Sequence, residues 1–131
     1  MKTILLVDDD EWYRDVLSRV LVKKGYSVLE AGSGKSGIKF LQQKDLSINV
    51  VLLDYFLQDM TGIDFLNHLE QFEKPPIIVL TGYDDMEIRG EILARGAELC
   101  LRKTISQENL IAIIQWMMIR QDVPLEIQPH S

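Results

Sequence analysis

Short apolar runs recur along the chain, and four of them lead directly into polar residues. The runs and the residues that follow them are Ile4–Val7 with Asp8–Asp10, Val50–Leu53 with Asp54, Ile77–Leu80 with Thr81, and Leu99–Leu101 with Arg102 and Lys103. Short runs of this kind, rich in valine and isoleucine, are typical of strands that are buried on both faces. We therefore expect buried strands whose terminal polar residues gather along one edge of a parallel sheet.

Amphipathic segments alternate with these runs. The expected helices cover 11–24, 33–43, a segment that opens at Thr61 and Gly62, 84–95, and a last segment from Ser106 to about Gln121, while 27–31 forms a further strand. This alternation predicts an α/β fold with a five-stranded parallel sheet and helices on both faces, because parallel strands need right-handed crossovers. The short connections favour the doubly wound, flavodoxin-like order 2-1-3-4-5, whose ligand crevice lies at the carboxyl ends of strands 1 and 3.

The length and composition indicate one globular domain. We expect it over 1–121, followed by a tail or the start of a linker over 122–131, which contains Pro124 and Pro129. The formal net charge of −6 argues against direct nucleic-acid binding by this domain, since phosphate backbones attract clustered lysine and arginine. No stretch approaches the roughly 20 apolar residues that span a bilayer, and the amino terminus does not resemble a signal peptide. The single cysteine, Cys100, is expected to be a small buried residue, and we expect a cytoplasmic protein with no membrane contact.

The polar strand ends carry a consistent chemistry. Asp9 and Asp54 offer the oxygen ligands that Mg²⁺ prefers, with Asp8 acting through water. A carboxylate oxygen of Asp54 can act as a nucleophile toward phosphorus, as in known aspartyl phosphates. The Lys103 ammonium would neutralise phosphoryl oxygens, and the Thr81 hydroxyl would donate a hydrogen bond to one of them. Phosphoryl transfer needs little more from a protein than such positioning and charge stabilisation.

Each of these residues also has an ordinary explanation when it is taken alone. An aspartate after a strand is often the N-cap of the next helix, a threonine often lies in a turn, and a lysine is usually on the surface. Four strand ends with complementary chemistry favour a shared site over four separate coincidences.

The motifs around these positions occur together in a known family. They are ILLVDDD followed by Arg14, VVLLD with Gly62 eight residues later, IIVLTG, and GAELCLRK. Over about residues 2–121, this set resembles the receiver domain of two-component response regulators. The resemblance implies a signalling phosphoacceptor that works with a histidine kinase or a phosphotransfer protein and catalyses only its own phosphorylation and dephosphorylation.

The resemblance also implies a role for each site residue. Asp54 would accept the phosphoryl group from a kinase phosphohistidine. Asp8 and Asp9 match the acidic pair that holds Mg²⁺ (or Mn²⁺), and the backbone carbonyl of Phe56 matches a further metal ligand. The two remaining matches, to the family's switch hydroxyl and its lysine, are Thr81 and Lys103.

The chain departs from the family pattern at four positions. Thr104 replaces the usual proline after Lys103, so this loop is expected to be either strained or trans with a repositioned lysine. Gln58 replaces another common proline, and Thr61 replaces an aspartate that often precedes the glycine. Cys100 replaces the usual aromatic switch residue on the last strand. A thiol cannot swing a ring between two rotamers, so we expect an atypical readout of the signal.

The last expected helix is apolar on more than one face. The residues expected to cover the sheet are Leu110, Ile113, Ile114 and Met117. The apolar residues left over are Ile111, Trp116, Met118 and Ile119. Since an exposed apolar patch marks an interaction surface, we expect these four to bind a second copy of the chain or an output partner. Packing against the tail is the alternative.

Two other functions share parts of the pattern. In a haloacid-dehalogenase-like phosphatase, Asp8 and Asp10 would act as nucleophile and acid on external phosphate esters. That interpretation leaves Asp54 without a role, and no segment has the length of a cap domain. The second alternative, favoured by Thr104 and Cys100, is an interaction module that is not phosphorylated.

Overall fold

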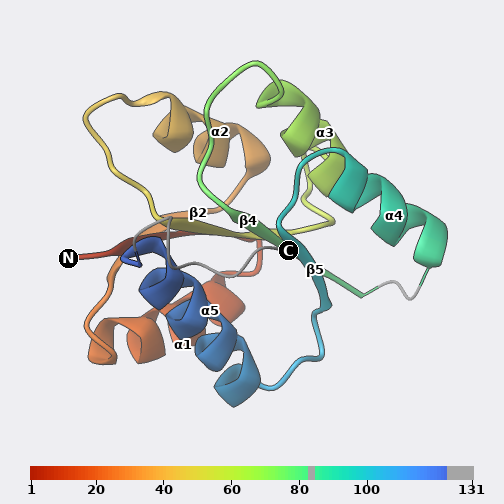
Figure 1. Ribbon diagram of the computed structural model, residues 1–131. Coiled ribbons are helices and arrows are strands. Elements are labelled where there is room, and N and C mark those ends of the chain that lie inside the picture. The colour runs from red at the N-terminus through yellow and green to blue at the C-terminus, as the bar shows by residue number, and fades with distance from the viewer. Residues whose placement is uncertain (83–84, 124–131) are drawn as a thin grey trace.

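The computed structural model describes residues 1–82 and 85–123, which form one parallel sheet flanked by helices (Figure 1). The strands are β1 (Thr3–Val7), β2 (Ser27–Ala31), β3 (Val50–Asp54), β4 (Ile77–Thr81) and β5 (Leu99–Arg102). The helices are α1 (Glu11–Lys23), α2 (Gly34–Gln42), α3 (Gly62–His68), α4 (Met86–Ala94) and α5 (Gln107–Gln121). The order β2-β1-β3-β4-β5, with every neighbouring pair parallel, confirms the predicted fold class and strand order.

Side-chain caps fix where the helices begin. Each helix follows a residue whose side-chain oxygen accepts a hydrogen bond from an N–H of the first turn, and these residues are Asp10, Ser33, Thr61, Asp85 and Ser106. At α3 the cap is reciprocal, because the Asp64 carboxylate accepts a bond from the Thr61 N–H. Such caps satisfy N–H groups that have no partner within the helix. The observed helices therefore begin close to the predicted positions.

The helices cover both faces of the sheet, with α1 and α5 on one face and α2, α3 and α4 on the other (Figure 1). Successive strand residues point alternately into the two cores. In β1, Leu5 and Val7 belong to the core that contains Phe65 of α3. Ile4 and Leu6 belong to the core formed with α1 and α5. Because the centre of the sheet is buried on both faces, β1, β3 and β4 are apolar except at their ends.

The buried face of α5 differs from the prediction. Ile111 and Met118, expected to be exposed, are only 6% and 4% exposed, whereas Trp116 and Ile119 are 55% and 65% exposed. The residues of α5 that are buried in the sheet core are Leu110, Ile111, Ile114, Met117 and Met118. They form one stripe along the helix, broad enough to include positions on both sides of Ile114. The predicted four-residue patch is thus wrong for Ile111 and Met118, and two of its members remain on the surface.

Two further expectations concern the cysteine and the end of the chain. Cys100 is buried in β5, as predicted. Most of the predicted tail, 124–131, lies outside the described residues, so a domain boundary at 122 stays a prediction. Within the described ranges 1–82 and 85–123, no helix combines the length and the apolar character needed to cross a membrane.

We expect Gly37→Ala to lower the free energy of unfolding by about 1–2 kcal/mol, because the added methyl overpacks the core. A Cβ at Gly37 would lie 2.8 Å from Cγ2 of Val7 and 3.1 Å from Cε2 of Phe65. The control is Gly90→Ala in α4, where a Cβ meets nothing within 4 Å and alanine should stabilise the helix by up to about 1 kcal/mol. Urea unfolding measures both variants, and equal stabilisation by the two would contradict the packing argument.

Candidate functional site

The predicted carboxylates meet at one edge of the sheet. β1 and β3 are neighbours with Val7 opposite Leu53, so the next residues, Asp8 and Asp54, leave the sheet side by side. Carboxylate oxygens of Asp8, Asp9 and Asp54 lie within 4.8 Å of one another. Asp8 and Asp54 are buried and Asp9 is half-buried. The topology therefore brings together residues that are far apart in the sequence.

Backbone and arginine contacts hold the loop that carries Asp8. The Asp10 N–H donates to Asp8 Oδ1 at 2.9 Å, and Arg14 Nη1 donates to the Asp8 carbonyl at 2.6 Å. Arg14 also approaches Glu30 at 3.4 Å, which ties α1 to β2. The Asp10 side chain accepts a bond from the Tyr13 N–H at 3.1 Å and serves as the helix cap. Of the three consecutive aspartates, two therefore belong to the carboxylate cluster and the third starts α1.

Lys103 follows the edge strand β5, and its side chain reaches this carboxylate cluster. Its N–H donates to the Thr81 carbonyl at 2.9 Å, which holds the backbone beyond β5 against the end of β4. Its Nζ lies 2.9 Å from Asp8 Oδ2 and 3.2 Å from Asp54 Oδ2. The described residues contain no cis peptide bond, so the bond between Lys103 and Thr104 is trans. Of the two expectations for this loop, the structure shows the trans form, with the ammonium on the carboxylates.

Thr81 and Phe56 lie beside Asp54 in different ways. Thr81 is buried at the end of β4, one residue beyond Leu80, the register partner of Asp54. Phe56 lies in the turn after β3, where the Gly62 N–H donates to the Tyr55 carbonyl at 2.6 Å. The Phe56 side chain is half exposed. The roles of the Thr81 hydroxyl and the Phe56 carbonyl stay predictions.

The site carries more negative than positive side chains. Three carboxylates share one edge with a single ammonium in contact with two of them. Burial raises the pKa of Asp54 to about 6, the charge of Asp8 adds to the rise, and Lys103 opposes it. Burial on its own would lower the pKa of Lys103, but its hydrogen bond to Asp8 and the charge of Asp54 outweigh this effect and raise it. Like charges held this close favour the binding of a cation.

The donor set fits a hard divalent cation. Asp8, Asp9 and Asp54 each offer a carboxylate oxygen, and these oxygens are close enough to share one ion. Mg²⁺ binds through oxygen, usually with one or two carboxylates, several waters and a phosphate oxygen. The half-exposed position of Asp9 leaves room for water and for an incoming phosphate on the solvent side. Soft ligands do not contribute, because Cys100 lies within β5 and outside this group.

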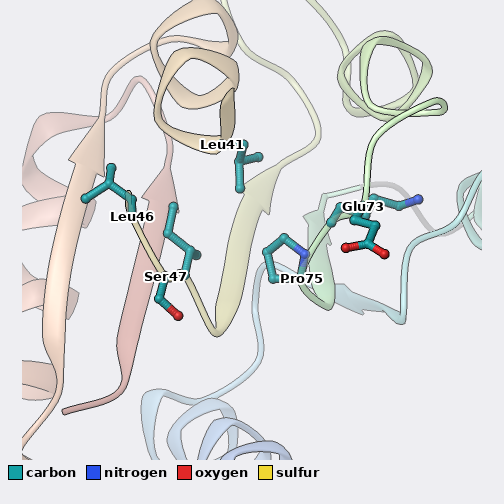
Figure 2. Close-up of a pocket in the computed structure, with 7 residues that line it drawn as sticks. Leu41, Leu46, Ser47, Glu73 and Pro75 are labelled. Atoms are coloured by element: carbon teal, nitrogen blue, oxygen red, sulfur yellow. The ribbon is translucent and has the colours of Figure 1, made fainter. Parts of the chain in front are cut away.

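Surface grooves of larger volume lie away from the carboxylate cluster. A groove of about 300 Å³ opens between the segments that precede β3 and β4, at the opposite edge of the sheet (Figure 2). Its lining residues are Leu41, Leu46, Ser47, Ile48, Glu73, Lys74 and Pro75. The hollow lined by Asp8 and Asp54 holds only about 10 Å³. This small hollow is also lined by Leu6, Leu17, Leu52 and Leu80, and it is distinct from the acidic edge formed by the carboxylates of Asp8, Asp9 and Asp54.

Sequence reasoning missed one neighbour of the site. Tyr13 lies in the helix expected over 11–24, and its ring centroid lies 4.8 Å from Lys103 Nζ. Burial raises the pKa of the Tyr13 phenol, so the ring is neutral at pH 7. The available signal was its place in the first turn of α1, three residues after Asp10, because that turn adjoins the carboxyl end of β1.

Comparisons with known sequences agree with this geometry. The sequence profile of the family described as "Response regulator receiver domain" matches residues 4–115. The chain is 34% identical over 120 residues to the transcriptional regulatory protein CpxR of Klebsiella pneumoniae subsp. pneumoniae (strain HS11286), covering 92% of this chain and 50% of that protein. It is 29% identical over 109 residues to a cyclic di-GMP phosphodiesterase of Thermotoga maritima, covering 82% of this chain and 28% of that protein.

A solved structure extends the comparison. The fold is similar to the crystal structure of a response regulator receiver domain protein (CheY-like) from Methanospirillum hungatei JF-1, with a TM-score of 0.85 and 28% identity. That likeness covers 93% of this chain and 97% of the other. The chain spans half or less of the two curated relatives but nearly all of this receiver domain.

We expect Asp54→Asn to stabilise the protein in a pH-dependent way. Between the ordinary carboxyl pKa near 4 and the folded value of about 6, the folded state holds a proton that the unfolded chain releases, so wild-type stability falls as the pH rises. Without divalent cations, Asp54→Asn should gain about 1–3 kcal/mol over the wild type at pH 7.5 and almost nothing at pH 4.

Urea unfolding across this pH range measures the difference between the two proteins. Asp45→Asn, which changes an exposed aspartate, is the matched control and should show no such trend. A gain at Asp54 that is constant from pH 4 to pH 7.5 would contradict the burial argument.

Proposed function

The chain belongs to the family of response regulator receiver domains, and on that premise we propose that Asp54 accepts a phosphoryl group from the phosphohistidine of a histidine kinase or a phosphotransfer protein. The observation that supports this choice most directly is the position of Asp54. It ends β3 next to Asp8 at the carboxyl edge of the sheet, with its Oδ2 3.2 Å from Lys103 Nζ. The family is one of signalling phosphoacceptors, and we propose that this chain catalyses only its own phosphorylation and dephosphorylation.

The transfer itself needs an ionised Asp54. One carboxylate oxygen attacks the phosphorus, the bond between phosphorus and the donor imidazole breaks, and the imidazole nitrogen keeps the electron pair. With a pKa of about 6, Asp54 is mostly ionised at pH 7 and above, and a bound cation would favour the ionised form further. Asp8, Asp9, Asp54 and the Phe56 carbonyl would hold Mg²⁺ or Mn²⁺. When bound, this ion supplies the positive charge that screens the incoming phosphoryl group.

Lys103 and Thr81 complete the proposed site. The Lys103 ammonium already contacts Asp54, so a small shift would pair it with an oxygen of the new phosphoryl group. The Thr81 hydroxyl, at the end of the adjacent strand, would donate a hydrogen bond to another oxygen. Preorganised donors of this kind stabilise the charge that develops during transfer.

The response to phosphorylation would pass through the last strands and helices. Thr81 ends β4, and the chain then leads to α4. Arg89 of α4 donates to the Cys100 carbonyl of β5 at 2.9 Å, so these two elements are already linked. Because Cys100 has no ring to rotate, we propose that the switch acts by shifting this α4–β5 contact and the neighbouring α5 surface.

The site geometry favours this function over the phosphatase alternative. Asp10, which that alternative needs as an acid, is engaged as the helix cap of α1. The relative named as a phosphodiesterase is matched over 28% of its length, and its named activity is not carried over to this chain.

We expect the wild type, incubated with acetyl phosphate and Mg²⁺, to gain one phosphoryl adduct in its intact mass. Asp54→Asn should gain none, because the nucleophile is lost, and EDTA should prevent the reaction of the wild type. Asp45→Asn is again the control and should react normally, since this aspartate is exposed and remote from the carboxylate cluster.

Two other outcomes would overturn the proposal. An adduct that survives Asp54→Asn but disappears in Asp8→Asn would favour the phosphatase. A folded wild type that gains no adduct would favour the interaction module that is not phosphorylated.

We also expect the exposed apolar residues of α5, Trp116 and Ile119, to contact a second copy of the chain or an output partner. Changing both to glutamine should weaken self-association of the phosphorylated protein by about tenfold or more, because large apolar side chains dominate such interfaces. Sedimentation velocity over a concentration series measures the effect. Trp12→Gln removes another exposed indole, from α1, and is the matched control. Unchanged sedimentation together with intact partner binding would refute this use of α5.

A further inference from the structure

Tyr13 is fixed at the start of α1 by the helix cap. Its N–H donates to Asp10 Oδ1 at 3.1 Å, and the side chain is half-buried. From this position the face of the ring contacts Lys103, whose Nζ lies over the ring, 4.8 Å from its centroid. Tyr13 also lines the small hollow beside Asp8 and Asp54. The ring thus borders the site without belonging to the carboxylate cluster.

The Lys103 side chain must extend across several strands to contact Asp8. It follows β5 at one edge of the sheet, while Asp8 follows β1, and β4 and β3 lie between them. Neighbouring strands are about 4.8 Å apart, so the loop and an extended side chain together span three such intervals. The lysine side chain has four flexible carbons and many alternative rotamers in water. The productive rotamer therefore needs contacts that disfavour the others.

Two of the contacts that hold Lys103 are made with carboxylates that are also proposed metal ligands. Asp8 and Asp54 each offer oxygens to the ammonium and, in the proposed function, to Mg²⁺. During the proposed reaction a cation would compete with the ammonium for those oxygens, and the phosphoryl group would bond to one oxygen of Asp54. The ring of Tyr13 is a third contact, and neither an ion nor a phosphate competes for its apolar face.

We propose that Tyr13 is a positioning residue that holds the Lys103 ammonium over the site through its ring face. The inference rests on the proposed function, because its consequence is faster phosphoryl transfer to Asp54. A neutral aromatic ring attracts an ammonium at this distance through its quadrupole, and the attraction is greatest when both groups are partly removed from water. The ring face, and not the phenol oxygen, is the part that acts.

The test compares a variant that keeps the ring with one that removes it. With acetyl phosphate and Mg²⁺, Tyr13→Phe should be phosphorylated at nearly the wild-type rate, whereas Tyr13→Leu should be about two- to tenfold slower. Intact mass over time gives both rates. Trp12→Leu removes the neighbouring exposed indole and should leave the rate unchanged. If Tyr13→Leu does not fold, Tyr13→Met provides the same comparison with a flexible apolar side chain.

A second readout does not depend on phosphorylation. In the NMR spectrum, the Hε protons of Lys103, assigned by comparison with Lys103→Arg, should be shifted upfield by the ring current. The shift should persist in Tyr13→Phe and disappear in Tyr13→Leu. A merely structural role for Tyr13 would not produce this pattern.

The outcomes separate the two proposals. If the wild type is phosphorylated and Tyr13→Leu is as fast as Tyr13→Phe, the positioning role is overturned while the proposed function stands. If Tyr13→Phe is as slow as Tyr13→Leu, the hydroxyl acts and the ring-face inference is wrong. If the wild type gains no phosphoryl group, the proposed function fails. The contact between Tyr13 and Lys103 would still be supported if the ring-current shift were lost in Tyr13→Leu and kept in Tyr13→Phe.

Discussion

The contact of one ammonium with two buried carboxylates is the interaction on which the site depends. Asp8 and Asp54 lie side by side because β1 and β3 are neighbours, and their two carboxylates repel each other when both are ionised. Lys103 offsets part of this repulsion, yet the pKa of Asp54 remains raised to about 6. The folded protein therefore holds an excess of negative charge at this edge, which a bound cation would relieve. In the proposed function, stability and reactivity are linked through the same carboxylate.

The doubly wound sheet makes this arrangement possible at little cost to packing. Its central strands, β1, β3 and β4, are apolar and buried on both faces, so their polar residues are confined to the strand ends. At the carboxyl edge, the loop after β1 is held by Arg14 and by the cap of α1, while the backbone of Lys103 is held by Thr81. Each functional side chain thus extends from a fixed backbone, which limits the freedom that binding must remove.

The features that distinguish this chain lie around the site and on the output side. Thr104 and Cys100 stand where the family resemblance leads us to expect a proline and an aromatic residue, and the structure shows a trans bond and an α4–β5 hydrogen bond from Arg89 at these places. The large apolar side chains exposed on α5 are Trp116 and Ile119. In the proposed function, phosphoryl chemistry and signal readout would therefore depend on different residues.

The sequence by itself determined the strands, the helix starts and the set of polar strand ends. Uninterrupted apolar runs and capping residues are local signals, so the fold class, the strand order and the gathering of Asp8 with Asp54 could be predicted. Only the tertiary structure decided which α5 residues are buried, because the axis of an apolar stripe depends on how the helix lies on the sheet. It also brought the Tyr13 ring to Lys103, since a contact between α1 and the loop after β5 leaves no periodic trace in the sequence.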